Sequence, residues 1–294
     1  MPDASALSAA LAAAADDAHA RTRLGQIRPL RGVRGVPNGA LARIIDAAWK
    51  EGPTRLPYDA PVLRALFGQA WEDGIVAIAL AAGALPDAPD VALELGLAWL
   101  SLVDDAETAD ALGLALIGPG LLATGADLPA AALAVAAGQA PGAGHDDDDA
   151  DDDDYDDADD DDDGSGRDAP DPRRGGRTIW ARRAVLAAGL AGLPVPLEGP
   201  VAAALRARLG MTHVAFVAEP QDAFVAGVLR AFVRDEAPPV RKALLRTWRA
   251  WASVDPDAAT DLLDAIPGGV SKVVRADVEG AARKAWARAR RAEP

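Results

Sequence analysis

Arginine is the residue type whose distribution along this chain most clearly suggests chemistry. Residues 173–183 hold five of them, namely Arg173, Arg174, Arg177, Arg182 and Arg183. A second basic region, residues 21–64, contains nine Arg and Lys side chains, including Arg31 and Arg34. Clustered cations of this kind can bind phosphates without reading a base sequence, so both regions are candidate contacts with a nucleic-acid backbone. The alternative is that Arg serves here only as a solubilising residue.

Several other chemistries are excluded or unsupported. The chain has no cysteine, which excludes disulfides, thiolate metal sites and a cysteine nucleophile. The three histidines, His19, His145 and His213, lie too far apart to show a metal-ligand spacing. The phosphate-binding GxxxxGK(S/T) loop, the dinucleotide GxGxxG, the zinc HExxH and the hydrolase GxSxG motifs are also missing. We therefore expect no metal and no cofactor.

The sequence pattern has helical periodicity almost everywhere along the chain, so we expect helices to position the basic clusters. Residues 39–50 place Leu41, Ile44, Ile45, Ala48 and Trp49 on one stripe, which is the pattern of an amphipathic helix. Similar patterns predict further helices over 61–70, 73–83, 91–103, 104–117, 128–137, 178–190, 199–209, 219–234, 238–253, 255–266 and 270–291. No stretch alternates with the period of a strand, so the sequence predicts an all-α fold.

The spacing of these helices favours one arrangement over another. Helices of about 10–16 residues are joined by short Pro/Gly turns and recur in pairs about every 30–40 residues, which is typical of stacked helical hairpins. We therefore expect an α-α superhelix of stacked helical hairpins. A globular helical bundle is the alternative.

An acidic segment divides the chain into two parts. The net charge is −15, but residues 146–163 contain 15 Asp and no basic residue, and the remainder is balanced. Such a segment repels itself and supplies no apolar surface, which predicts disorder. We therefore divide the chain into helical repeats over 1–141, a linker over 142–176 and further helical repeats over 177–294.

The compartment is inferred from the absence of targeting signals. Asp3 stands where a secretory signal would have a basic residue, and Asp16 and Asp17 interrupt the apolar stretch that follows. The apolar run from Ala111 to Ala126 is short and is broken by glycine and proline. We expect a cytoplasmic monomer that does not cross a membrane.

Four segments of the chain resemble one family, the bacterial DNA alkylation repair glycosylases built from HEAT-like repeats. The segments are 31–37 (RGVRGVP) with 41–50, 99–105 (WLSLVDD) with 109–112 (ADAL), 179–184 (IWARRA), and 240–243 (VRKA). The second and third are the most specific, and they occur in the order that the family shows. The resemblance covers most of residues 30–290.

This resemblance implies a basic concave groove that binds double-stranded DNA. In that family an Asp stabilises the oxocarbenium-like sugar as a cationic alkylpurine departs, with an Arg and Trp rings around it. By position, Asp110 corresponds to that Asp and Arg183 to that Arg. The residues implied to contact DNA are Arg31, Arg34, Arg173, Arg174, Arg177, Trp180, Arg182, Arg241, Lys242 and Trp248.

Two positions depart from the family pattern. Ala106 stands where a Trp is expected four residues before Asp110, and Arg246 stands where a Trp is expected six residues after Val240. Both departures remove aromatic rings that would surround a cationic base. The sequence therefore favours DNA binding, with base excision a weaker expectation. The alternative function is a non-enzymatic HEAT-repeat scaffold whose concave face binds a protein.

Overall fold

A computed structural model describes residues 4–27, 29–50, 59–125, 172–196, 201–202 and 215–292. Within these ranges the chain is helical and contains no strand; Gly32 and Ala70 form one isolated bridge. The predicted all-α class is thereby confirmed. The helices predicted over 128–137 and most of 199–209 lie outside the described residues, as does the acidic segment up to residue 171.

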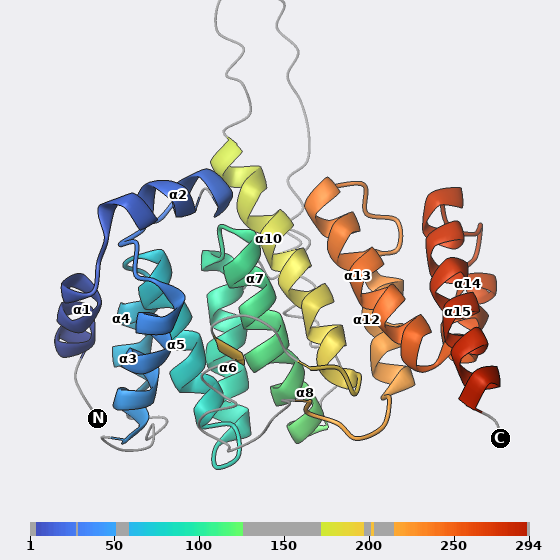
Figure 1. The fold of residues 1–294 in the computed structure, drawn as a ribbon, viewed down its shortest axis with the longest axis horizontal. Helices are drawn as coiled ribbons and strands as arrows, with labels where there is room; N and C mark the ends of the chain where they lie inside the picture. Colours follow the sequence, from blue (N-terminus) through green and yellow to red (C-terminus); the bar gives the residue numbers. More distant parts are fainter. Residues whose placement is uncertain are drawn as a thin grey trace, which may run out of the picture.

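One row of helices runs through the molecule in chain order (Figure 1). Each helix of the row contacts the next. The members are α3 (Asn38–Lys50), α5 (Trp71–Gly83), α7 (Ala106–Leu112), α10 (Pro172–Gly189), α13 (Pro238–Val254) and α15 (Lys272–Ala292). Helix α10 begins at Pro172, five residues inside the predicted linker. This row carries most of the side chains discussed below as candidate ligand contacts, whereas Arg31 and Arg34 lie in the segment before α3.

A second row packs against the first. Helices α4 and α6, α6 and α8, and α12 and α14 are in contact within this row, and α4, α12 and α14 also contact the first row. The bounds are α4 (Ala60–Phe67), α6 (Pro89–Trp99), α8 (Gly118–Thr124), α12 (Asp222–Phe232) and α14 (Pro256–Ala265). At the N-terminal end, α1 (Ala4–Ala13) contacts α3, α4 and α5, and α2 (Asp17–Ile27) follows it.

The core consists mainly of Ala, Leu and Val, together with a few large aromatic rings. Trp71, Trp99, Trp248 and Trp251 are almost completely buried, and the rings of Phe67 and Trp99 stack at 4.4 Å. On the predicted stripe of α3, Leu41, Ile45, Ala48 and Trp49 are buried as expected. The apolar faces read from the sequence thus pack between the two rows.

Aspartates begin two helices as predicted. The Asp105 side chain accepts a hydrogen bond from the backbone N–H of Thr108, and Asp255 accepts one from Ala258. Asp73, by contrast, was expected to begin a helix, but α5 begins at Trp71. The Asp73 carboxylate is buried and pairs with Arg34 instead. The pairing with a distant Arg, rather than the local cap, decides the role of this carboxylate.

The helix predicted to stop at Gly118-Pro119 continues through them. After α7, a π-helical turn, η2 (Gly113–Ile117), leads directly into α8. The combined stretch Ala106–Thr124 is long and apolar enough to cross a membrane by length and composition, but most of it is buried inside the protein. It packs against α10, α5 and α6, as a core helix does.

Two glycines allow this stretch to approach α10 closely. A Cβ at Gly113 would lie 1.9 Å from the carbonyl oxygen of Ala184, and a Cβ at Gly118 would lie 2.5 Å from that of Ala188. No side chain other than hydrogen fits at such distances. The two backbones therefore touch here, which fixes the position of the neighbouring residue Arg183 on α10.

Candidate nucleic-acid interface

Three helices of the first row meet at the carboxylate of Asp110. Arg183 on α10 donates to it twice, from Nε to Oδ1 and from Nη2 to Oδ2, both at 2.8 Å. Arg246 on α13 donates from Nη1 to Oδ2 at 2.9 Å. The structure therefore brings together Asp110 and Arg183, the two residues to which the resemblance gave a catalytic role. It adds Arg246, which occupies the position of an expected Trp.

Backbone packing explains why this cluster forms. Asp110 lies one turn before Gly113, and Arg183 directly precedes Ala184, so the close contact of these two backbones aligns the acid and the guanidinium. Arg183 also donates from Nη1 to the carbonyl oxygen of Pro239 at the start of α13. The Arg183 side chain is only 10% exposed, and it joins α7, α10 and α13.

The Asp110 cluster carries a local excess of positive charge. One carboxylate faces two guanidinium groups, and guanidinium remains protonated at any ordinary pH. Asp110 is 21% exposed and Arg246 is 44% exposed, so the cluster can be reached from solvent. Arg246 contacts Asp110 through Nη1, and its side chain is the more exposed of the two. Such a cluster attracts an anion more readily than a cation.

Arg31 lies inside the protein and does not face a ligand. Its guanidinium donates to Asp104 at 2.9 and 3.1 Å, to Thr108 Oγ1 at 3.1 Å and to the carbonyl oxygen of Phe67 at 2.8 Å. The side chain is 10% exposed. Its donors are therefore used to hold the segment before α3 against α4 and α7, which does not support the DNA contact implied for Arg31.

Arg34 fastens the same segment to α5. It donates from Nε and Nη2 to the buried carboxylate of Asp73, at 2.6 and 3.0 Å, and from Nη2 to Ser8 Oγ. The Glu72 carboxylate accepts from the backbone N–H groups of Arg34, Gly35 and Val36. Like Arg31, Arg34 acts within the fold, and these two residues do not extend the Asp110 cluster.

The carboxylate of Asp105 belongs to the same network, where its ionised form is disfavoured. Its pKa is raised to about 6, chiefly by burial and to a smaller extent by the neighbouring charge of Asp104. Its hydrogen bonds with Thr108 and the charge of Arg31 oppose this rise. Burial has the largest effect, because a carboxylate without water is costly to ionise.

The remaining candidates on α10 and α13 differ in burial and in their contacts. The structure contradicts a DNA contact by Trp248, because its ring is fully buried and its Nε1 donates to the carbonyl oxygen of Ala259. Trp180 is half-buried against the core. Arg182 donates from Nη1 to Asp235 at 2.5 Å, which ties α10 to the turn before α13.

The other predicted contacts lie on α10 and α13. Arg241 is half-buried and Lys242 is exposed near the start of α13. Arg173, Arg174 and Arg177 lie in the first turns of α10, and their side chains are outside the part that the structure describes. DNA contact by these five residues stays a prediction.

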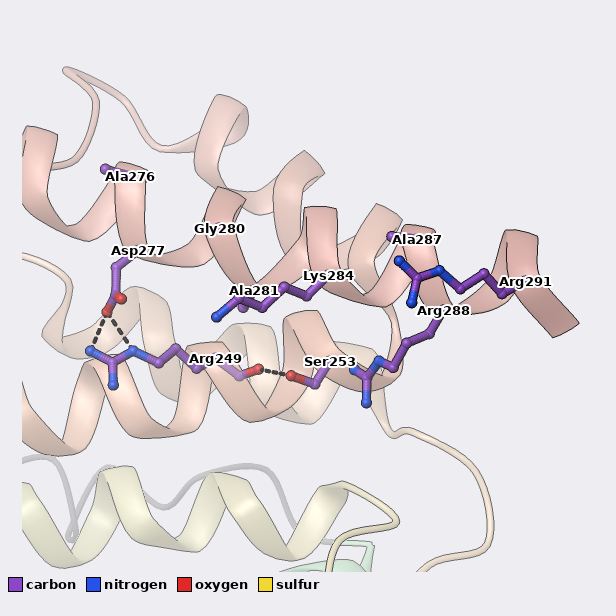
Figure 2. A pocket seen from close by; sticks show the side chains of 10 residues that line it. All are labelled: Arg249, Ser253, Ala276, Asp277, Gly280, Ala281, Lys284, Ala287, Arg288 and Arg291. Atoms are coloured by element: carbon purple, nitrogen blue, oxygen red, sulfur yellow. Dashed lines mark hydrogen bonds and ion pairs between the residues drawn. The ribbon is translucent and has the colours of Figure 1, made fainter.

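Sequence reasoning missed a basic groove between α13 and α15. The groove has a volume of about 760 Å³ and is lined by Arg249, Lys284, Arg288 and Arg291, with Asp277 at one end (Figure 2). The signal was available: Lys284, Arg288 and Arg291 are spaced four and three residues apart, which places them on one face of a helix.

The groove and the Asp110 cluster share helix α13. Arg246 and Arg249 are three residues apart on it, one turn along the same face. Arg246 reaches toward α7 and Arg249 toward Asp277 on α15. The two sites therefore adjoin across the exposed side of α13.

Comparisons of the chain with models of protein families, with curated proteins and with solved structures found no match.

Proposed function

We propose that the protein binds double-stranded DNA along its first row of helices, and that its two rows form a superhelix of HEAT-like hairpins. The neighbour-to-neighbour order of contacts within each row supports the superhelix. The four segments that resemble alkylpurine DNA glycosylases support DNA as the ligand. The proposed face runs from α7 across α10 and α13 to α15.

The observation that carries this proposal is the cluster of Asp110, Arg183 and Arg246. Asp110 and Arg183 are 73 residues apart in the sequence, yet the two residues singled out by the resemblance form a bidentate pair. Bidentate pairing fixes the orientation of both groups. A functional centre requires such fixed geometry, and the partial exposure of Asp110 and Arg246 leaves this one accessible.

The cluster favours binding over base excision. Excision would use the negative charge of Asp110 to stabilise a positively charged sugar, but here two guanidinium groups offset that charge. Ala106 and Arg246 also replace rings that could surround a cationic base. We therefore assign the face to recognition of the DNA backbone.

The first experiment measures binding of a labelled duplex by fluorescence anisotropy over a series of salt concentrations. Each neutralised phosphate contributes about −0.9 to the slope of log K against log salt. With about four to six contacts, affinity should fall by roughly two to three orders of magnitude over a fourfold rise in salt. A flat response, or no binding at low salt, would refute the proposal and favour the protein-binding scaffold.

The second experiment tests Asp110 in a glycosylase assay on DNA that contains 7-methylguanine. We expect the wild-type protein to release the base slowly at most, and Asp110→Asn to release none, because the amide lacks the stabilising charge. Asp110→Asn should bind DNA as well as or better than the wild type, since DNA repels carboxylates. Robust excision by this variant would remove Asp110 from any such mechanism.

A further inference from the structure

We propose that the groove between α13 and α15 is a phosphate-binding site that accepts consecutive phosphates of a nucleic-acid strand and does not read its bases. None of its cations belongs to the segments that resemble the glycosylases. The identification of the phosphates as those of DNA rests on the proposed function. The affinity of the groove for phosphate does not.

Small residues on α15 open the groove. Gly280 and Ala281 lie between Asp277 and Lys284, and they leave space between the two helices (Figure 2). Ser253 lines the opposite side, on α13. Larger side chains at these positions would fill the space that a ligand needs.

The charge of the groove is strongly positive and mostly uncompensated. Arg249 donates to Asp277 Oδ2 through both Nε and Nη2. The negative charge of Asp277 therefore offsets the positive charge of Arg249. Within the described part of the chain, Lys284, Arg288 and Arg291 have no hydrogen bond or ion pair through their side chains. Three cations thus face solvent without an internal partner.

The arrangement of these cations fits a chain of anions. With a rise of 1.5 Å per residue, Lys284 and Arg291 are about 10 Å apart along the axis of α15, with Arg288 between them. Figure 2 shows Arg288 extending toward Ser253 across the groove and Lys284 extending toward its centre. Guanidinium forks complement the paired oxygens of a phosphate. A linear set of three cations would neutralise a linear set of phosphates.

The lining also excludes recognition of bases. None of the described residues that line this groove is aromatic, so they offer no ring on which a base could stack. Among the described residues that line it, the one carboxylate, Asp277, is paired with Arg249. The groove therefore supplies affinity and register rather than sequence specificity. Its position next to Arg246 makes it a continuation of the Asp110 face.

The test compares two double variants of the same helix with equal loss of charge. The groove variant is Lys284→Gln with Arg288→Gln; the control is Lys272→Gln with Arg290→Gln, two exposed cations of α15 that do not line the groove. Loss of two phosphate contacts should weaken duplex binding roughly 60-fold at about 0.1 M salt and reduce the salt slope by about 1.8. The control should stay within about threefold of the wild type, since neither of its side chains lines the groove.

A calorimetric titration with inorganic tripolyphosphate separates this inference from the proposed function. Groove-dependent binding of tripolyphosphate without any DNA binding would uphold the site and refute DNA as the ligand. DNA binding that is equal in the groove variant and the control would overturn the site and leave the proposed function standing. Equal competition by a polyglutamate peptide of matched charge would also overturn it, by showing a general attraction of acids.

All the variants must be folded for this comparison. The substituted side chains are exposed, so far-UV circular dichroism and thermal unfolding should match the wild type. If Arg288→Gln alters folding, Lys284→Gln with Arg291→Gln removes the same charge from the same groove. The same outcomes then decide the question.

Discussion

Replacement of Gly113 by alanine should damage the junction on which the Asp110 cluster depends. A Cβ at this position would lie 1.9 Å from the carbonyl oxygen of Ala184 and 2.9 Å from the backbone nitrogen of Ala188. Both atoms belong to the backbone of α10, so no side-chain rotation can relieve the collision. The two helices must move apart.

The size of this movement determines how much stability the protein loses. Contacts of a Cβ below 3.0 Å essentially do not occur, so the backbones must separate by about 1 Å, enough to forfeit a quarter to a half of each local dispersion contact. Overpacking of this kind costs about 1–3 kcal/mol and occasionally more. Alanine returns up to about 1 kcal/mol through its helix propensity. Because the colliding atoms belong to the backbone, the upper end of this cost applies, and we expect a net loss of about 2 kcal/mol, which corresponds to a fall in Tm of roughly 4–8 °C.

Urea denaturation followed by circular dichroism measures this loss, with Gly227→Ala as the control. Gly227 lies in α12, and a Cβ there would meet nothing within 4 Å. The control should be stabilised by about 0.5–1 kcal/mol, because alanine favours the helix. If Gly113→Ala were as stable as the control, the close contact of the two backbones would not exist as described.

Two further predictions concern charge. Because burial raises the pKa of Asp105 to about 6, the folded protein binds a proton there at pH values where the unfolded chain does not. This contribution is complete below about pH 4 and is lost as the pH rises through 6. In urea titrations, the stability of the wild type relative to Asp105→Asn should therefore fall by up to about 3 kcal/mol between pH 4 and 7.5; a difference independent of pH would contradict the burial argument. Deletion of residues 145–166 should tighten DNA binding, since fifteen tethered carboxylates are held at an effective concentration in the millimolar range and lower the potential that attracts DNA. Equal affinity with and without this segment, measured by anisotropy at low salt, would show that its charge has no influence.

Local features of the fold were predictable because they depend on local sequence. The stripe in residues 39–50 and the start of a helix at Asp255 depend only on neighbours within a few positions, and both were predicted. The continuation of the helix through Gly118-Pro119 was missed, because it depends on a π-helical turn that packs against α10. Nothing in the residues around Pro119 reports that distant contact.

The candidate site was predictable only in part for the same reason. The resemblance identified Asp110 and Arg183, but the second cation, Arg246, lies 136 residues from Asp110. Arg31 pairs with Asp104 across 73 residues, which no count of clustered arginines could distinguish from a free surface cation. Composition indicated where cations are abundant. The tertiary fold determines which of them remain available to a ligand.

The contact between α7 and α10 also joins two pieces of chain that are far apart in sequence. Residues 4–125 end at α8 and residues 172–292 begin at α10, and the two pieces meet through glycine-lined backbone packing and the pairing of Asp110 with Arg183. This junction is an interface in the sense used for two subunits. The covalent connection then acts as a tether, which replaces a bimolecular association by an intramolecular one at a high effective concentration. A break in residues 126–171 would remove none of the described contacts. The two pieces would then have to associate with each other, so the assembly of the Asp110 cluster would depend on protein concentration.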